Sequence, residues 1–230
     1  MKAYILKSHW VLFLLFIYAC HPGANTKTKL ASTSIEIAAF TPSFEFPTAK
    51  ASYYIESTQN LKKDGVASIS KIDFTLYRFA HLAYRKENKL FDTQSLDKKL
   101  DRAMLGNDYQ KIESIAAQIL EKNFTDLSAH FVMSYAMMQS GKDGSLHLEI
   151  YKSLLNSIQA SGDGKSPATA FVLTQEKEAM LMVNTLKLKP STTFYANMSD
   201  RNIKIIECRD EEDQSHSIYF DISPIAQFSF

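Results

Sequence analysis

The chain has 230 residues, and its 26 Lys and Arg nearly balance 25 Asp and Glu, which gives a formal net charge of +1. A chain this close to neutral lacks the basic footprint of a nucleic-acid-binding protein, so we expect no nucleic-acid partner. Cys20 and Cys208 are the two cysteines of the sequence. If the first carries a lipid, as argued next, no pair remains for an intramolecular disulfide.

The N-terminus has the three-part pattern of a secretory signal. Lys2 and Lys7 form a short positive region, and residues 10–18 form an apolar core. That core is too short to span a bilayer about 30 Å thick. The sequence IYAC at 17–20 resembles the lipobox of bacterial lipoproteins, in which the cysteine becomes lipidated. We therefore predict that Cys20 is a lipid attachment site, with a plain cleaved signal or an uncleaved anchor as the alternatives.

Residues 1–19 are accordingly predicted to be a lipoprotein signal peptide, and residues 20–43 a flexible tether rich in Thr, Ser, Ala and Pro. The protein would be exported and anchored by its lipid in the cell envelope. No acidic run follows Cys20, which favours the outer membrane with the protein facing the periplasm. The expected partners are the membrane, through the lipid, and an envelope protein.

Residues 44–160 are predicted to form a helical hairpin region. We expect a short helix around residues 49–57 and another over 73–84, where a wide apolar face indicates packing on two sides. Apolar residues at helical spacing predict four more helices between 95 and 160. The last three of these should be capped by Asn107, Thr125 and Ser145.

Four helices of this length joined by short turns pack as antiparallel hairpins. Gly106 and Gly141 lie 35 positions apart, which is close to the tetratricopeptide period of 34 residues. LGxxY at 105–109 matches part of that repeat, although its Ala-x3-Phe element is absent. The sequence therefore predicts tetratricopeptide-like packing rather than a proven repeat array.

Residues 161–230 are predicted to form an α+β region that is one compact unit with the helices. Thr174 should cap a helix. Runs rich in β-branched and aromatic residues predict strands at 168–173, 191–197, 202–208 and 217–222, with a turn at 210–214. The predicted fold class is α+β: an N-terminal helical bundle of tetratricopeptide-like hairpins followed by a small, mostly antiparallel sheet with one helix.

The run SGDGKSP at 161–167 has the composition of a phosphate-binding loop. A Walker loop would need a glycine where Gln159 stands, and it would follow a strand rather than a helix. We therefore expect no nucleotide. The run is instead interpreted as a helix stop in which Gly162 takes the left-handed position. Asp163, Lys165 and Ser166 remain candidate binding residues.

Motifs for metal binding or catalysis are not visible. The four histidines after the predicted tether do not form a pair at i, i+4, and they are His81, His130, His147 and His216. The acidic run 210–213 is typical of a solvated turn. We expect no metal and no cofactor, and we assign no catalytic residue.

Four segments together resemble the Bacteroidetes family of exported proteins called domain of unknown function 4919. They are YRFAHLAYR at 77–85, NFTDLSA at 123–129, SGDGKSPATAF at 161–171 and YFDIS at 219–223. The resemblance covers about residues 77–223. A Tyr-Tyr-Gly in the first helix is absent, and Glu178-Ala179 replaces an expected Glu-Tyr. The family has no assigned activity, so the resemblance implies an exported bacterial protein and no particular chemistry.

The function itself is not encoded in any motif. The leading hypothesis is a lipid-anchored interaction or scaffold module without enzymatic activity, in which the helical hairpins or the sheet edge meet a partner. The alternative is an envelope hydrolase or carbohydrate-processing enzyme with a spatially assembled site near residues 161–166. An enzyme would need several titratable groups that converge in a pocket.

Overall fold

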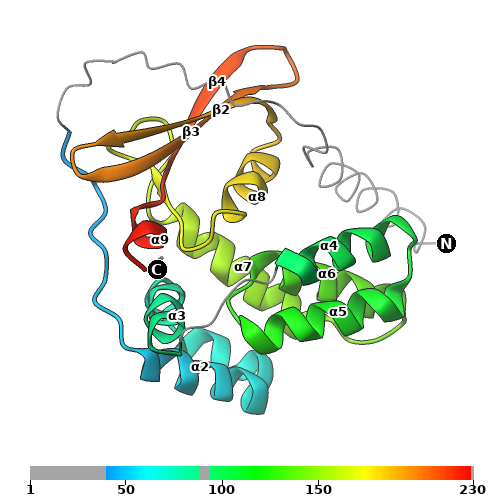
Figure 1. The fold of residues 1–230 in the computed structure, drawn as a ribbon. Coiled ribbons are helices and arrows are strands. Elements are labelled where there is room, and N and C mark those ends of the chain that lie inside the picture. The colour runs from blue at the N-terminus through cyan, green and yellow to red at the C-terminus, as the bar shows by residue number, and fades with distance from the viewer. Residues whose placement is uncertain (1–39, 89–93, 229–230) are drawn as a thin grey trace.

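The structure is a computed structural model that describes residues 40–88 and 94–228. Cys20, the predicted signal peptide and the tether up to residue 39 lie outside the described residues. Within these limits the fold is α+β, with the helices mostly preceding the sheet in the chain (Figure 1). Among the described residues, no helix is both long and apolar enough to cross a membrane.

The helices account for most of the described chain. In chain order they are α2 (Ala51–Asp64), the 3-10 helix η1 (Gly65–Lys71), α3 (Phe74–Asn88), α4 (Gln94–Leu105), α5 (Tyr109–Lys122), α6 (Leu127–Gln139), α7 (Ser145–Gln159), α8 (Glu178–Thr185) and α9 (Ser223–Phe228). Helices α4 to α7 confirm the four helices predicted from periodicity. Each packs against the next, but this arrangement does not confirm tetratricopeptide-like hairpins.

The predicted helix caps are wrong. Gly144 precedes α7 where Ser145 is expected as the cap, and Lys177 precedes α8 where Thr174 is expected, in both cases without a side-chain cap hydrogen bond. The caps of α5 and α6 are displaced by one residue. Asp108, not Asn107, caps α5 by accepting a hydrogen bond from Lys111 N. Asp126, not Thr125, caps α6 in the same way. In both turns an aspartate follows the expected residue, and a carboxylate also interacts favourably with the positive end of the helix dipole.

The sheet has four strands in the order β1-β4-β3-β2. Their bounds are Phe171–Val172 for β1, Lys189–Met198 for β2, Arg201–Arg209 for β3 and Ser215–Asp221 for β4. Strands β2, β3 and β4 are antiparallel, whereas β1 pairs in parallel with β4. The predicted antiparallel strands and the turn before β4 are confirmed. The strand predicted over 168–173 is reduced to two residues.

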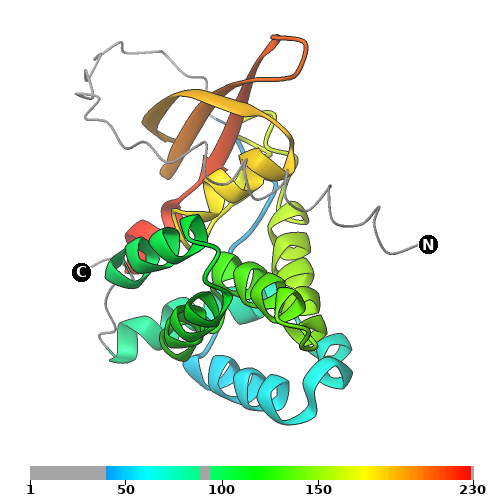
Figure 2. The same ribbon diagram turned by 90° about the vertical axis from the view of Figure 1, so that its right-hand side faces the viewer.

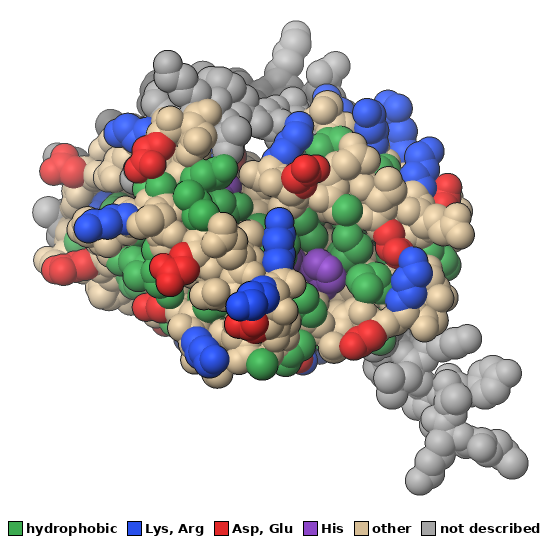
Figure 3. Space-filling view, turned by 90° about the horizontal axis from the view of Figure 1, so that it is seen from below, with side chains coloured by type: hydrophobic (Ala, Val, Ile, Leu, Met, Phe, Trp, Pro, Cys, Tyr) green, Lys and Arg blue, Asp and Glu red, His purple; other side chains and the backbone are tan. Residues whose placement is uncertain are grey.

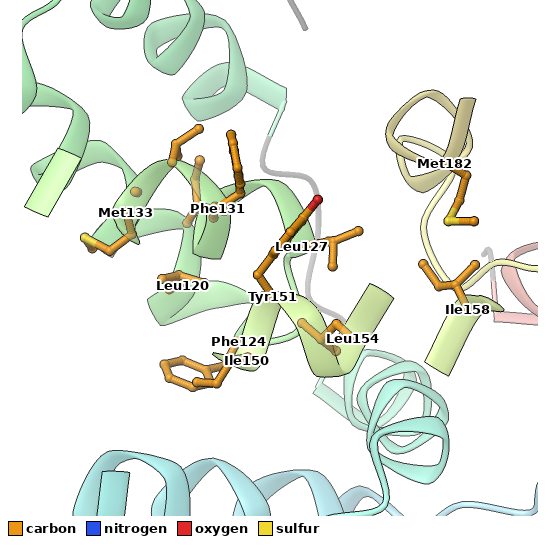
Figure 4. Close-up of a cluster of buried hydrophobic side chains, with 14 of the residues drawn as sticks. Leu120, Phe124, Leu127, Phe131, Met133, Ile150, Tyr151, Leu154, Ile158 and Met182 are labelled. Atoms are coloured by element: carbon orange, nitrogen blue, oxygen red, sulfur yellow. The ribbon is translucent and has the colours of Figure 1, made fainter. Parts of the chain in front are cut away.

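One main core joins the helices to the sheet. Aliphatic and aromatic side chains of α5, α6 and α7 interdigitate in it, with Met182 of α8 close to Ile158 of α7 (Figure 4). Helix α8 lies between the bundle and the sheet in both ribbon views (Figures 1 and 2). The inner face of the sheet adds Ile206 and Phe220 to the same core. Bundle and sheet therefore share one hydrophobic interior.

The backbone conformation of Gly162, at the junction between bundle and sheet, differs from the predicted one. Gly164, with φ of 69°, takes the left-handed conformation, and Gly162 does not. Gly162 is required for another reason: a Cβ there would overlap the Thr169 carbonyl oxygen and lie 2.7 Å from the Ala170 carbonyl oxygen. The chain thus folds back on itself, and only a residue without a side chain fits between the two arms.

The start of the described chain runs as a strap across the sheet and the bundle. Phe40 N donates to Ser199 Oγ in the β2–β3 turn at 3.0 Å, and Ser43 binds the Ala168 carbonyl. Phe46 then packs on Phe79 of α3, with ring centroids 5.7 Å apart. The packed part of the molecule therefore extends back to residue 40, inside the segment predicted as a tether.

Candidate functional site

A hollow lies between the β2–β3 hairpin and α9. Its volume is about 450 Å³, within the range of small-molecule sites. The residues that line it are Glu176, Tyr195, Ala196, Asn197, Asn202, Ile203, Ile222, Ile225 and Ala226. They come from three separate parts of the sequence, so the hollow exists only in the folded chain. We call it the hairpin hollow.

Glu176 is the charged residue of the hairpin hollow. Its Oε1 accepts a hydrogen bond from the Tyr195 hydroxyl at 2.6 Å and contacts Lys204 Nζ at 3.0 Å. These contacts hold the pKa of the Glu176 carboxyl below its usual range. Burial and the adjacent carboxylate raise the pKa of Tyr195 to about 12. Near neutral pH the carboxylate is therefore charged, the phenol is protonated, and Lys204 balances the charge.

Two amides complete the polar lining. Asn197 Nδ2 donates to Asn202 Oδ1 at 3.3 Å. Within the described chain, Asn197 Oδ1 and Asn202 Nδ2 make no further hydrogen bond, so one acceptor and one donor group remain available to a ligand. Ile222 and Ile225 add apolar surface to the same lining. A neutral ligand with both polar and apolar surface suits this lining.

Strand β2 is an edge of the sheet, since in the described chain no strand pairs with its far side. Three consecutive residues of β2, from Tyr195 to Asn197, line the hairpin hollow. Successive side chains of a strand point to opposite faces. The hollow must therefore reach the backbone edge of β2 as well as one face of the sheet.

The segment between β1 and α8, residues 174–178, connects the hairpin hollow to the bundle. Its last member, Glu178, accepts hydrogen bonds from the backbone N–H groups of Thr174 and Gln175. It also forms an ion pair with Arg78 of α3 at 3.0 Å, and both side chains are at most 2% exposed. Arg78 donates in addition to the Val172 carbonyl at 2.9 Å. This pair joins the first helices of the bundle to the sheet.

Gln175 joins the same segment to the turn before α6. Its amide accepts from Asn123 Nδ2 at 2.8 Å and donates to the Thr125 carbonyl at 3.1 Å. The Thr125 hydroxyl lies 3.0 Å from His81 Nδ1. Buried polar groups of three elements therefore bind one another, although His81 Nε2 has no partner within the described chain. Thr125, predicted as a helix cap, is fully buried among them.

Lys177 makes the third connection. Its ammonium lies 2.5 Å from Asp126 Oδ2 and 3.1 Å from Asp97 Oδ1 of α4. Burial alone would raise the pKa of the Asp126 carboxyl, but Lys177 and the cap hydrogen bond with Ala129 lower it overall. The two carboxylates likewise outweigh burial and raise the pKa of Lys177. Consecutive side chains of one short segment thus hold α3, α4, the α6 turn and the hairpin.

The structure brings together two histidines that are 17 positions apart. His130 of α6 and His147 of α7 approach to 2.9 Å between their Nδ1 atoms. His130 Nε2 lies 3.0 Å from the Phe124 carbonyl, which requires that this nitrogen carry the proton. Burial and the neighbouring His147 lower the pKa of His130 to about 3. In the described chain no group of three metal-ligating side chains occurs.

Stability should fall as the pH drops below 6.5. Burial, and to a lesser extent the positive charge of Arg85, lowers the pKa of His81 to about 3. Burial likewise lowers the pKa of His130 to about 3. Both rings gain protons near pH 6.5 when the chain unfolds, so the unfolded state binds more protons between pH 6.5 and 3. In this window each buried histidine should lower the free energy of unfolding by about 1.4 kcal/mol for every unit by which the pH falls.

Urea unfolding at pH 7.5 and 5.5 measures this loss, which should be about 2 to 3 kcal/mol for the two rings together. Measurements above pH 5 leave the carboxylates ionised. An unfolding free energy that stays constant between these two pH values would contradict the buried neutral state of both histidines.

The predicted binding residues lie at the bundle–sheet junction, away from the hairpin hollow. Asp163 Oδ1 accepts from Lys165 N at 3.0 Å and from the Thr169 hydroxyl at 2.5 Å. Ser166 Oγ also lies 3.0 Å from the Thr169 hydroxyl. These contacts fix the turn after Gly162. Cys20, the predicted lipid attachment site, lies outside the described residues.

The hairpin hollow was not anticipated from the sequence. Glu176, Tyr195 and Asn202 belong to no motif, and pairing of β2 with β3 brings the last two together. One signal was available. Residues 190–198, PSTTFYANM, contain no charge in a chain of which 22% is charged, and edge strands usually carry charges that prevent association.

Charged side chains of both signs are interspersed over the face of the bundle seen from below (Figure 3), as the near-zero net charge implies.

The family model described as domain of unknown function (DUF4919) matches residues 69–229. Neither the curated proteins nor the solved structures contain a match to the chain.

Proposed function

We propose that this protein, which belongs to the DUF4919 family, is a lipid-anchored interaction module of the cell envelope without enzymatic activity. The hairpin hollow is its binding site. The observation that carries this proposal is the lining of the hollow, where Glu176 is held by the Tyr195 hydroxyl and by Lys204 beside two amides and apolar side chains. Its titratable lining residues are Glu176 and Tyr195, and their pKa values are shifted away from neutrality in opposite directions.

Acid–base catalysis needs a group whose pKa lies near the working pH. Glu176 holds its charge and Tyr195 holds its proton, so both act as fixed hydrogen-bonding groups. Binding sites have this property, with a few oriented polar atoms beside apolar surface. The lining of amides, an aromatic ring and isoleucines therefore favours recognition over reaction.

The alternative of a hydrolase assembled near residues 161–166 has weaker support. Asp163 is engaged by a backbone amide and a hydroxyl within its own turn. Neither it nor Ser166 lines the hairpin hollow. A nucleophile at this junction would need a neighbouring base within hydrogen-bond reach, whereas Ser166 is paired with Thr169.

The export and anchoring of the module rest on the N-terminal sequence. Replacing Cys20 with serine should release the protein from the membrane fraction, because more than one acyl chain is needed for stable anchoring and all of them would be lost. Membrane fractionation of cells that express each form gives the answer. Unchanged fractionation of Cys20→Ser would refute lipidation at this residue.

Partner binding at the hairpin hollow is tested by two neighbouring residues of α9. Ala226 lines the hollow and Gln227 does not, and both are exposed. Ala226→Arg should fill the hollow and abolish capture of a partner from detergent-solubilised envelopes, and Gln227→Arg adds the same charge and should leave capture intact. Equal capture by the wild type and both variants would place the binding site elsewhere. No capture by any of the three would count against the interaction module.

A further inference from the structure

We propose that β2 pairs with β2 of a second copy of the chain, so that two sheets become one continuous sheet across a twofold axis. This self-association goes beyond the proposed function and does not depend on it. The argument rests on the charge of the strand, on where its exposed aromatic residues stand, and on what lies next to them.

Strand β2 lacks the protection that edge strands usually carry. Residues 190–198 contain no charged side chain, whereas natural proteins place lysines, inward-pointing charges or bulges along open edges. Pro190 and the register irregularity beside it occur only at the first end of the strand. From residue 192 onward the register with β3 is continuous, so a regular strand faces outward without an electrostatic barrier.

A second copy is the occupant that this strand matches best. Two copies of an uncharged strand can lie antiparallel without placing like charges opposite each other, which would destabilise the pair. A twofold axis makes the same patch meet itself, which is the commonest arrangement in protein oligomers. The strand is therefore complementary to itself in charge and in direction.

Phe194 fixes the register of the pairing. It is the middle residue of the uncharged run 190–198, and its side chain is 48% exposed. If the full run pairs antiparallel with its copy, Phe194 stands opposite the Phe194 of the second copy. Aromatic residues directly opposite each other across two strands stabilise the pair. A large apolar side chain exposed at the centre of an edge strand then becomes buried.

The outer face of the sheet would continue across the axis. Phe194 pairs with Ile205 of β3, which pairs in turn with Tyr219 of β4. Ile205 and Tyr219 are partly buried and pack against the cluster that contains Met198. Two such rows joined at Phe194 form a single apolar row across six strands. Residues 195–197 of one copy would also bring the second copy to the rim of the hairpin hollow.

Disulfide trapping tests the register. Phe194→Cys places two thiols directly opposite each other, at a separation that a disulfide can span. Thr192→Cys is the matched control, since Thr192 is exposed on the same strand and the same face but would stand opposite Ala196. The native Cys208 is buried. Under mild oxidation of the full-length protein, Phe194→Cys should form a disulfide-linked dimer at least ten times faster than Thr192→Cys.

Equal rates for the two cysteine variants, or no dimer from Phe194→Cys, would overturn the proposal. A second measurement does not depend on the introduced thiol. Sedimentation of the full-length protein in density-matched detergent should give the mass of a dimer, and Phe194→Lys should give a monomer because two ammonium groups would meet at the axis. Leu105→Lys, at a side chain 70% exposed on α4, should remain a dimer.

A monomeric wild-type protein would also overturn the inference, because β2 would then not pair with a second copy. This failure is distinguishable from a failure of the proposed function. Sedimentation reports the dimer and capture from solubilised envelopes reports the partner, so a monomeric protein that still captures a partner would overturn this inference alone. Phe194→Lys should lower the mass in sedimentation from that of a dimer to that of a monomer.

Discussion

Arg78→Met is expected to lower the free energy of unfolding by about 3 to 5 kcal/mol, the range found when one partner of a buried ion pair is removed. Glu178 would remain at about 2% exposure. The N–H groups of Thr174 and Gln175 would still bind the carboxylate, but its cationic partner would be lost. Urea or thermal unfolding of the purified protein measures the change.

Two further variants distinguish the loss of the ion pair from the loss of packing by a long side chain. Adding Glu178→Gln to Arg78→Met should recover part of the stability, since the amide removes the buried charge and keeps one oxygen for the backbone N–H groups. Lys152→Met breaks the exposed pair with Glu149, whose side chains are 52% and 41% exposed. It should cost at most about 0.5 kcal/mol. An equally small effect for Arg78→Met would show that the buried pair does not hold bundle and sheet together.

Gly162→Ala is expected to lower the free energy of unfolding by about 3 kcal/mol or more. The added Cβ would overlap a backbone carbonyl oxygen of Thr169 and crowd that of Ala170. Backbone atoms cannot move aside as a flexible side chain can, and overpacking of this kind costs up to about 3 kcal/mol even where side chains adjust. Chemical denaturation, or the yield of folded protein, reports the loss.

Gly106→Ala is the matched control for this change. Gly106 also follows a helix, but the nearest atom to an added Cβ is 3.7 Å away and its φ is not positive. The stability of this variant should change little or rise by a few tenths of a kcal/mol, because alanine restricts the unfolded chain more than glycine. Similar losses in both variants would mean that the fold-back at residues 162–170 tolerates a side chain.

The helices and the antiparallel strands could be predicted because their signals are local. Apolar residues at helical spacing mark α4 to α7, and β-branched and aromatic runs mark β2 to β4. The capping errors had a local cause as well. Asn107 and Thr125 each precede an aspartate, and periodicity does not decide between two adjacent residues that both favour a cap.

The hairpin hollow could not be predicted in the same way. Glu176 is placed by the segment before α8, Asn202 by the register of β3, and Ile225 by the position of α9. Their proximity depends on pairings between distant parts of the chain that no spacing rule encodes. The polar residues of SGDGKSP, by contrast, drew attention because they are adjacent in sequence, and the structure shows Asp163 and Ser166 bonded within their own turn.

The contacts of residues 174–178 determine whether the bundle and the sheet unfold separately or together. In a fold of two weakly joined halves, amide hydrogens of the linker would exchange with solvent before those of either half. Here Gln175 binds the turn before α6, Lys177 binds α4 and Glu178 binds α3, while Glu176 binds the hairpin. Release of this segment must break all of these contacts at once. Bundle and sheet therefore open as a single cooperative unit, and their amides gain protection together.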